Sequence, residues 1–278
     1  MSLLAVLALA PCLHATTPDP ADSILNDPAR GYDLGLVAEL GTLWPLANTI
    51  QLSKSGTRFD YVEDGGQDNL AFFARLSAEL DIGPRHTVVL LYQPLDLRTQ
   101  ALLEENEVID DEVFFEGTAM DVRYGFDFYR ASWLWDAQAD PQRETAVGLS
   151  LQIRNAALDF TSVDGEKRRV NRDIGPVPAL KVRTRQPLGN TAWWGVEADG
   201  MYAPVKYING SGTDVVGAIL DASVRAGLPL AHGGEAFLNL RYLGGGAEGT
   251  SKDTSGPGDG WVSNWLHFVS LSMGLALR

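Results

Sequence analysis

The stretch DVRYGFDFYRASWLW, residues 121–135, indicates the fold most clearly. Its first half alternates strictly, and one face holds Val122, Tyr124, Phe126 and Phe128. The opposite face holds Asp121, Arg123, Gly125 and Asp127. A period of two is that of a β-strand, because successive side chains of a strand point to opposite faces of the sheet. We therefore expect a long amphipathic strand here.

Similar strands are expected along the rest of the chain, separated by Gly, Pro and Asn turns. They cover residues 32–43, 69–81, 87–103, 145–160, 174–185, 191–202, 215–226, 235–243 and 261–277. Residues 49–62 are either a further strand or an excursion between strands. Bacterial single-chain barrels use even strand numbers, so we predict about ten strands, with twelve as the alternative.

The connections between these strands alternate in length. Short ones lie at 83–84, 140–141, 187–190 and 229–234, and long polar ones at 104–112, 161–173, 204–213 and 244–260. Short turns at one end and longer loops at the other are typical of outer-membrane barrels. This pattern places both termini on the short-turn, periplasmic side.

Strand length and aromatic residues favour a membrane barrel over a soluble one. The predicted strands have about 12 to 18 residues, whereas strands of soluble proteins cluster near 5–6. Aromatic residues crowd toward segment ends, which suits the interfacial girdles of a membrane barrel better than an ordinary core. They are Trp133, Trp135, Trp193, Trp194, Tyr202, Trp261 and Trp265.

Charged residues on the expected inward faces also favour a membrane barrel. A dry soluble core does not accommodate many ions, whereas a wet or ion-paired lumen does. We expect the lumen to be lined by Arg75, Glu79, Asp121, Arg123, Asp127, Arg154, Lys181, Arg183, Glu197, Asp199, Asp221, Arg225 and Arg241. The predicted fold is therefore an all-β, up-and-down antiparallel transmembrane β-barrel.

The N-terminal region predicts export. Residues 3–13 are apolar and are followed by a small-residue site after Ala15, so residues 1–15 are expected to be a signal peptide. Residues 16–31 form a periplasmic lead segment, and residues 32–278 form the barrel. The only cysteine, Cys12, lies in the expected signal peptide, which excludes disulfide and thiolate chemistry in a cleaved chain. A net charge of −14 argues against a nucleic-acid partner.

These features together give the chain a resemblance to the outer-membrane β-barrel proteins of Gram-negative bacteria. The resemblance rests on the signal peptide, the repeated up-and-down pattern and the final amphipathic strand 261–277, and it covers nearly the whole mature chain. It also extends to uncharacterised barrels with segments like 56–60, 123–126 and 128–130. It implies location in the bacterial outer membrane, with membrane lipids, lipopolysaccharide and the barrel-assembly machinery as partners, and it implies no activity.

Motifs for chemistry are scarce. His267 is the weak candidate for a catalytic base, but Ser270 lies three positions on and therefore on the opposite strand face. The acidic run 104–112 lacks the spacing of a calcium loop, so a solvated loop is favoured and no metal or cofactor is predicted. The basic residues of a second long loop are candidates for contact with lipopolysaccharide phosphates, or form a solvated tip: Lys167, Arg168, Arg169 and Arg172.

The functional hypotheses follow from the charged lumen. A barrel of ten to twelve strands is narrow, so we expect either a structural or binding barrel plugged by ion pairs, or a channel for small solutes. A lipid-modifying enzyme centred on His267 and a soluble secreted barrel that binds an apolar ligand are the alternatives. An enzyme is the less favoured class.

Overall fold

The computed structural model describes residues 25–26, 30–204, 214–250 and 258–278. The expected signal peptide, residues 1–15, lies outside the described residues, as do most of the predicted loop 204–213 and part of the loop 244–260. No helix in the described part of the chain is long and apolar enough to cross a membrane.

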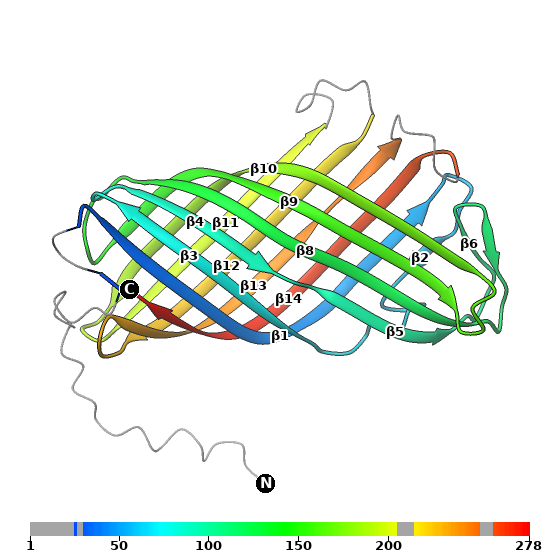
Figure 1. Cartoon of the computed structure of the whole chain (residues 1–278), viewed down its shortest axis with the longest axis horizontal. Coiled ribbons are helices and arrows are strands. Elements are labelled where there is room, and N and C mark those ends of the chain that lie inside the picture. The colour runs from blue at the N-terminus through cyan, green and yellow to red at the C-terminus, as the bar shows by residue number, and fades with distance from the viewer. Residues whose placement is uncertain (1–24, 27–29, 205–213, 251–257) are drawn as a thin grey trace, which may run out of the picture.

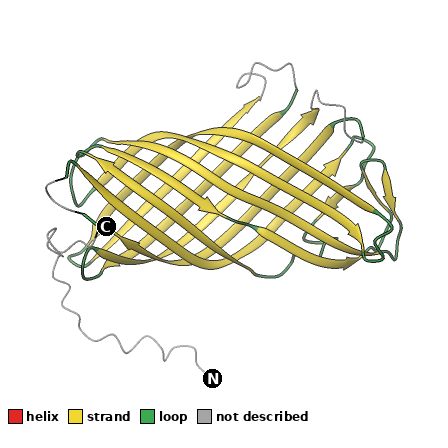
Figure 2. Cartoon of the chain, in the orientation of Figure 1, coloured by secondary structure: helices red, strands yellow, loops and turns green. Residues whose placement is uncertain are grey.

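The chain forms a closed, ten-stranded antiparallel barrel, which confirms the predicted fold and strand number (Figures 1 and 2). Each strand pairs with the next, and the first pairs with the last from Leu36↔Leu277 to Leu52↔Val262, so no edge remains there. The strands are β1 (Tyr32–Leu52), β3 (Ala71–Ile82), β4 (His86–Gln93) continued by β5 (Asp96–Leu102), β8 (Ala119–Asp136), β9 (Glu144–Ser162), β10 (Arg168–Leu188), β11 (Ala192–Pro204), β12 (Val216–Pro229), β13 (Gly234–Thr250) and β14 (Trp261–Leu277).

Three short strands lie at the long-loop end. β2 (Arg58–Asp60) pairs with the end of β1, while β6 (Glu107–Ile109) and β7 (Glu112–Phe114) form a separate hairpin. The segment 49–62 therefore contains the end of β1, a turn and β2. The acidic loop 104–112 is largely this hairpin rather than a bare charged loop.

The third wall strand is broken at Pro94, between β4 and β5. Proline has no amide hydrogen and interrupts a strand ladder. β4 pairs with both β3 and β8, but its ladder with β3 ends at Leu76↔Tyr92, and β5 is paired only with β8 in the described chain. The loop after β2 lies beside β5, where the Thr99 hydroxyl donates a hydrogen bond to the Gly65 carbonyl.

Several strands run farther than the sequence pattern indicated. β9 and β10 continue to a short turn at 163–167, so most of the predicted loop 161–173 is strand, and β13 extends to Thr250. A strand rises about 3.3 Å per residue, and a tilted bilayer crossing needs only about 9–11 residues. With 19 and 21 residues, β9 and β10 are long enough to project well beyond a membrane.

The outward face of the barrel changes character along these strands. Toward the short turns, β9 presents Val147, Leu149, Leu151 and Ile153 to the outside, each about half exposed. Toward the long loops, its outward positions hold Asn155, Asp159 and Thr161. We call the two parts of the barrel the short-turn half and the long-loop half.

The inward face becomes more apolar toward the long loops, whereas the outward face becomes more polar. On β8 the aromatic face from Val122 to Phe128 points into the barrel and is buried. The expected inward position of Asp121, Arg123 and Asp127 was therefore wrong. These side chains lie on the outer face, where Arg123 pairs with Asp96 at 2.8 Å and Asp121 accepts a hydrogen bond from Gln100 at 2.7 Å. The reason is that the long-loop half keeps apolar side chains inside and charges outside.

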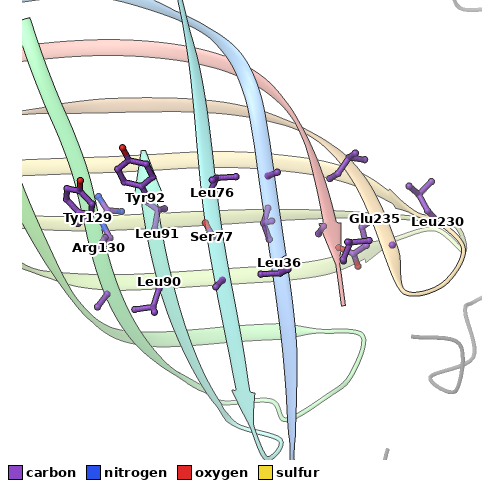
Figure 3. A pocket seen from close by; sticks show the side chains of 18 of the residues that line it. Leu36, Leu76, Ser77, Leu90, Leu91, Tyr92, Tyr129, Arg130, Leu230 and Glu235 are labelled. Carbon is purple, nitrogen blue, oxygen red and sulfur yellow. The ribbon is translucent and has the colours of Figure 1, made fainter. Parts of the chain in front are cut away.

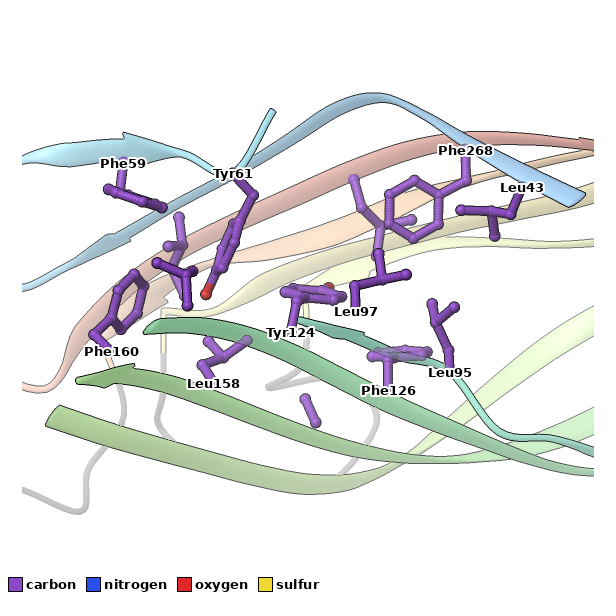
Figure 4. Close-up of a cluster of buried hydrophobic side chains, with 14 of the residues drawn as sticks. Leu43, Phe59, Tyr61, Leu95, Leu97, Tyr124, Phe126, Leu158, Phe160 and Phe268 are labelled. Carbon is purple, nitrogen blue, oxygen red and sulfur yellow. The ribbon is translucent and has the colours of Figure 1, made fainter. Parts of the chain in front are cut away.

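An aromatic plug fills the long-loop half of the lumen (Figure 4). Phe59 and Tyr61 enter from β2 and the residue after it, and meet Phe160 with ring centroids 5.1 and 5.6 Å away. Tyr61 also meets Tyr124 edge to face at 5.2 Å. The plug consists of Phe59, Tyr61, Tyr124, Phe126, Phe128, Phe160 and Phe268, with the aliphatic side chains of the same cluster around them.

The expected aromatic girdles are only partly present. Trp133, Trp135 and Trp194 lie on the outer wall of the short-turn half. Trp193 instead points inward and packs against Phe237 at 6.0 Å, with the Arg185 guanidinium 4.2 Å from its ring. Adjacent residues of a strand face opposite sides, so Trp193 and Trp194 cannot both belong to a girdle.

Candidate functional site: a closed, charged lumen

A layer of ion pairs crosses the lumen next to the aromatic plug. Arg130 of β8 donates to Asp199 of β11 and lies equally close to Asp221 of β12, with each nitrogen–oxygen distance 2.8 Å. Arg241 of β13 binds both oxygens of Asp221, at 2.5 and 2.7 Å. Lys181 of β10 lies 2.9 Å from Asp199. We call these five residues the ion-pair layer.

Amide side chains complete the layer. Arg130 donates to Gln152 Oε1 at 2.6 and 3.2 Å, and Arg241 donates to Gln93 Oε1 at 2.6 Å. The layer thus joins β4 to every strand from β8 to β13. Its five charged residues are only 1–4% exposed. A water-filled passage bordered by these side chains would wet them, so none of the five lines open water at this level.

A second group of charges centres on Glu39 of β1. Its Oε2 accepts hydrogen bonds from Asn239 and Ser272, both at 2.8 Å, and its Oε1 lies 3.5 Å from Arg225 and 3.7 Å from Arg75. Buried ions of opposite sign offset part of one another's desolvation. Glu39 is therefore a shared counter-ion for two cations.

A third group lies nearest the short turns. Glu79 pairs with Arg183 at 3.2 Å and with Arg278 at 3.3 Å, and Arg183 also pairs with Glu144 at 2.8 Å. Arg185 pairs with Glu235 at both oxygens, at 2.5 and 2.9 Å. The side chains of this group are more exposed than those of the ion-pair layer, so the lumen opens toward this end.

The structure brings nine of the expected lumen residues together inside the barrel. They are Arg75, Glu79, Lys181, Arg183, Glu197, Asp199, Asp221, Arg225 and Arg241. Asp121, Arg123 and Asp127 lie outside the wall, as described above. The side chain of Arg154 is outside the described residues.

Sequence reasoning missed several central members of the lumen. Arg130 shares the inward face of β8 with Phe128 and Ser132, so continuing that alternation along the strand would have found it. Glu39 lies in the N-terminal strand, whose alternation is interrupted by glycines at 35 and 41. Gln93 and Gln152 carry no charge and gave no signal.

His267 does not form a catalytic arrangement with Ser270. His267 is exposed on the outer wall, whereas Ser270 is buried on the inward face of the same strand. The close neighbour of His267 is the Tyr242 hydroxyl, 2.6 Å from its Nδ1. This pair lies between two strands of the outer wall, which suits an interfacial side chain.

Most of the candidate lipopolysaccharide contacts are engaged within the protein. Lys167 lies 3.2 Å from Glu112, Arg169 pairs with Asp111, and Arg168 pairs with Asp159 at 2.5 Å. Arg172 is exposed. The predicted acidic and basic loops therefore meet each other, and the ion pairs join the β6–β7 hairpin to β10.

An apolar depression of about 970 Å³ lies on the wall of the short-turn half (Figure 3). Its lining includes outward side chains of four neighbouring strands, Leu36, Leu76, Leu90 and Tyr129. A surface of this composition, which follows the outward faces of the strands, belongs to the apolar band of the barrel rather than to an aqueous site.

Comparisons with known proteins show resemblance in fold alone. Protein-family models and curated proteins gave no match. Among solved structures, the chain is similar to the outer membrane protease OmpT from Escherichia coli, with 10% identity, a TM-score of 0.46, and coverage of 88% of this chain and 96% of that one. It is also similar to the transport unit of the autotransporter AIDA-I from Escherichia coli, with 9% identity, a TM-score of 0.46, and coverage of 92% and 93%. The chain resembles Gram-negative outer-membrane β-barrels.

Proposed function

We propose that this protein is an integral outer-membrane β-barrel with a closed lumen, and that it works as a structural or binding barrel rather than as an open channel. The observation that carries the proposal is the ion-pair layer, whose charged side chains are 1–4% exposed across the lumen. The aromatic plug is a second barrier in series with it.

The outer wall supports insertion in a membrane. Large apolar side chains stand outward around the barrel, among them Leu40 at 70% exposed, Leu180 at 69% and Met273 at 69%. Contiguous exposed apolar surface of this kind marks a membrane or protein contact. In a bilayer the short turns would face the periplasm and the long loops would face the cell exterior.

Membrane insertion is tested by fractionation of cells that produce the full chain. We expect the protein in the outer-membrane fraction, resistant to extraction with carbonate or urea, and with slower gel migration after boiling because the barrel unfolds. A protein found in the soluble periplasmic fraction would contradict the proposal and would favour the soluble secreted barrel.

Closure is tested by conductance in planar bilayers. We expect the purified protein to insert without steady current steps, while an open porin reconstituted in parallel confirms that the bilayers report channels. Reproducible unitary steps from the wild-type barrel would overturn closure and establish the small-solute channel. Identical lipid profiles with wild-type and His267→Ala protein would remove the enzyme hypothesis.

A further inference from the structure

A polar cavity of about 560 Å³ lies among the long loops. Its walls come from the loop after β2, from β5 and from the segment that leads into β6. They contain five acids and no base among the described residues that line it: Glu63, Asp64, Glu104, Glu105 and Glu107. Ligand cavities commonly have volumes of about 300–1,000 Å³.

Glu107 distinguishes this cavity from a solvated acidic loop. The residue is only 3% exposed, and its Oε2 has no hydrogen-bond partner among the described residues. A buried carboxylate oxygen without a partner is costly, whereas most buried polar atoms in proteins are hydrogen-bonded. Glu107 lines the cavity, so a cation held there would offset the charge of its buried carboxylate.

The position of Glu107 is set by the β6–β7 hairpin. In β6, Glu107 shares a strand face with Ile109, which is packed in the cluster around the aromatic plug. Val108 between them is held from the other side, because Thr57 N–H donates to its carbonyl at 2.8 Å and its own N–H donates to Thr57 Oγ1 at 2.9 Å. The side chain therefore cannot turn out to solvent without unpacking the hairpin.

The opposite wall is held in place as well. Asp60 Oδ1 accepts from the Val62 N–H at 2.8 Å, and Asp64 Oδ2 accepts from the Asp60 N–H at 2.8 Å. The loop then turns at Gly66, whose φ of +66° is the left-handed conformation that glycine adopts readily. Both walls thus exist before any ligand binds, and little conformational entropy is lost on binding.

We propose that this cavity binds a small organic cation that carries amino groups, with Glu107 as the buried counter-ion. The volume favours an organic ion over a metal, and no group of three potential metal ligands is assembled in the described part of the chain. Leu102 and Leu103 supply apolar wall for a carbon chain, and the other acids supply attraction for a second ammonium group. The inference does not depend on whether the lumen conducts.

The protonation of Glu107 supports this assignment. Burial, reinforced by the negative charges of Asp64 and Glu105, raises the pKa of Glu107 to about 7. Glu63 and Glu104 also line the cavity. Both are acids, so neither can neutralise the charge of Glu107. A bound ammonium group favours the ionised carboxylate, so binding should release a proton near neutral pH and strengthen as the pH rises.

The test is calorimetric titration of 1,4-diaminobutane into the full-length folded barrel in detergent, at 150 mM NaCl to screen diffuse attraction to an acidic protein. We compare wild type with Glu107→Gln, which keeps the side-chain shape, and with Glu166→Gln, which removes the same charge from the exposed β9–β10 turn. We expect one saturable site, weakened about tenfold by Glu107→Gln because a charge-assisted hydrogen bond is lost, and unchanged by Glu166→Gln.

A pH series separates binding from folding. The wild-type affinity should rise several-fold between pH 6 and pH 8, and this rise should vanish in Glu107→Gln. Glu105→Gln, at an exposed position, provides a second variant and should weaken binding more modestly. Absence of saturable binding, equal weakening by Glu107→Gln and Glu166→Gln, or Ca²⁺ that binds more tightly than the diamine and displaces it, would each overturn the assignment.

Discussion

The two halves of this barrel solve the same packing problem with opposite polarity. In the short-turn half the lumen holds Arg130, Asp199 and Asp221, and the outer wall carries leucines. In the long-loop half the lumen holds aromatic rings, and the outer wall carries charges such as Asp159 and Arg168. The first half has the polarity of a membrane barrel and the second that of a soluble one. On the proposed membrane insertion, lipid outside the first half and water outside the second would account for the difference.

The largest expected effect is loss of a buried counter-ion in the short-turn half. Asp199→Ala should destabilise the barrel by about 3–5 kcal/mol, because Arg130 and Lys181 lose a buried counter-ion. Urea unfolding followed by tryptophan fluorescence in lipid vesicles measures the change. Asp159→Ala, which breaks an ion pair on the outer face of the other half, should cost less than about 1 kcal/mol. Equal losses would contradict the contrast.

A slightly smaller effect is expected in the aromatic plug. Phe160→Ala removes a ring that is 1% exposed and touches Phe59 and Tyr61, so it should cost about 3 kcal/mol through the cavity that remains. The control is Phe72→Ala on the outer wall, where the ring is 87% exposed and no cavity forms. The same urea titrations should show little change for the control. A much smaller loss of unfolding free energy for Phe160→Ala would mean that the plug is loosely packed.

The outer wall of β9 tests where the membrane ends. Leu151→Arg places a cation on the apolar band and should cost about 2–3 kcal/mol in a bilayer. Ala157→Arg lies at an outward position of the same strand, six residues nearer the long loops, and should cost less than about 1 kcal/mol because water surrounds it. Unfolding in vesicles compared with detergent measures the pair. A similar penalty at both positions would place the membrane boundary beyond residue 157.

The smallest expected effect is the titration of Glu107 in the long-loop half. Its pKa in the folded protein is raised from 4.5 to about 7, so the folded state binds the proton more tightly than the unfolded state. The contribution of Glu107 to the free energy of unfolding should therefore fall as the pH rises from 4.5 to 7, by about 1 kcal/mol where water in the cavity screens the charge. Chemical denaturation across this range measures it. The difference in unfolding free energy between wild type and Glu107→Gln should change across this range by that contribution, whereas the difference between wild type and Glu166→Gln should not.

Alternation along single strands predicted the fold well, because a period of two is a local property of the backbone. The segment 121–135 and its counterparts located all ten wall strands. The same patterns predicted nine of the lumen charges, which lie on strands in the short-turn half or near its border. The assignment of faces failed for Asp121, Arg123 and Asp127, since alternation shows two faces without showing which one is wet.

The candidate cavity illustrates a second limit. Residues 104–112 appear in the sequence as an acidic run, and nothing local marks Glu107 as buried. Its burial depends on the hairpin with Phe114 and on the contact with Thr57, about 50 residues away. The meeting of Asp111 and Arg169 is likewise a contact between distant segments.

The sequence by itself determined the strands, their up-and-down antiparallel order, a count of about ten with twelve as the alternative, and the chemical contrast between the faces of each strand, because these follow from local periodicity and turn residues. Only the tertiary structure decided which face points inward at each level, which charges meet across the lumen, and that β2 contributes Phe59 to the plug. Those features depend on closure of the barrel, which sets strand stagger and brings residues distant in sequence into contact, and no single strand carries that information.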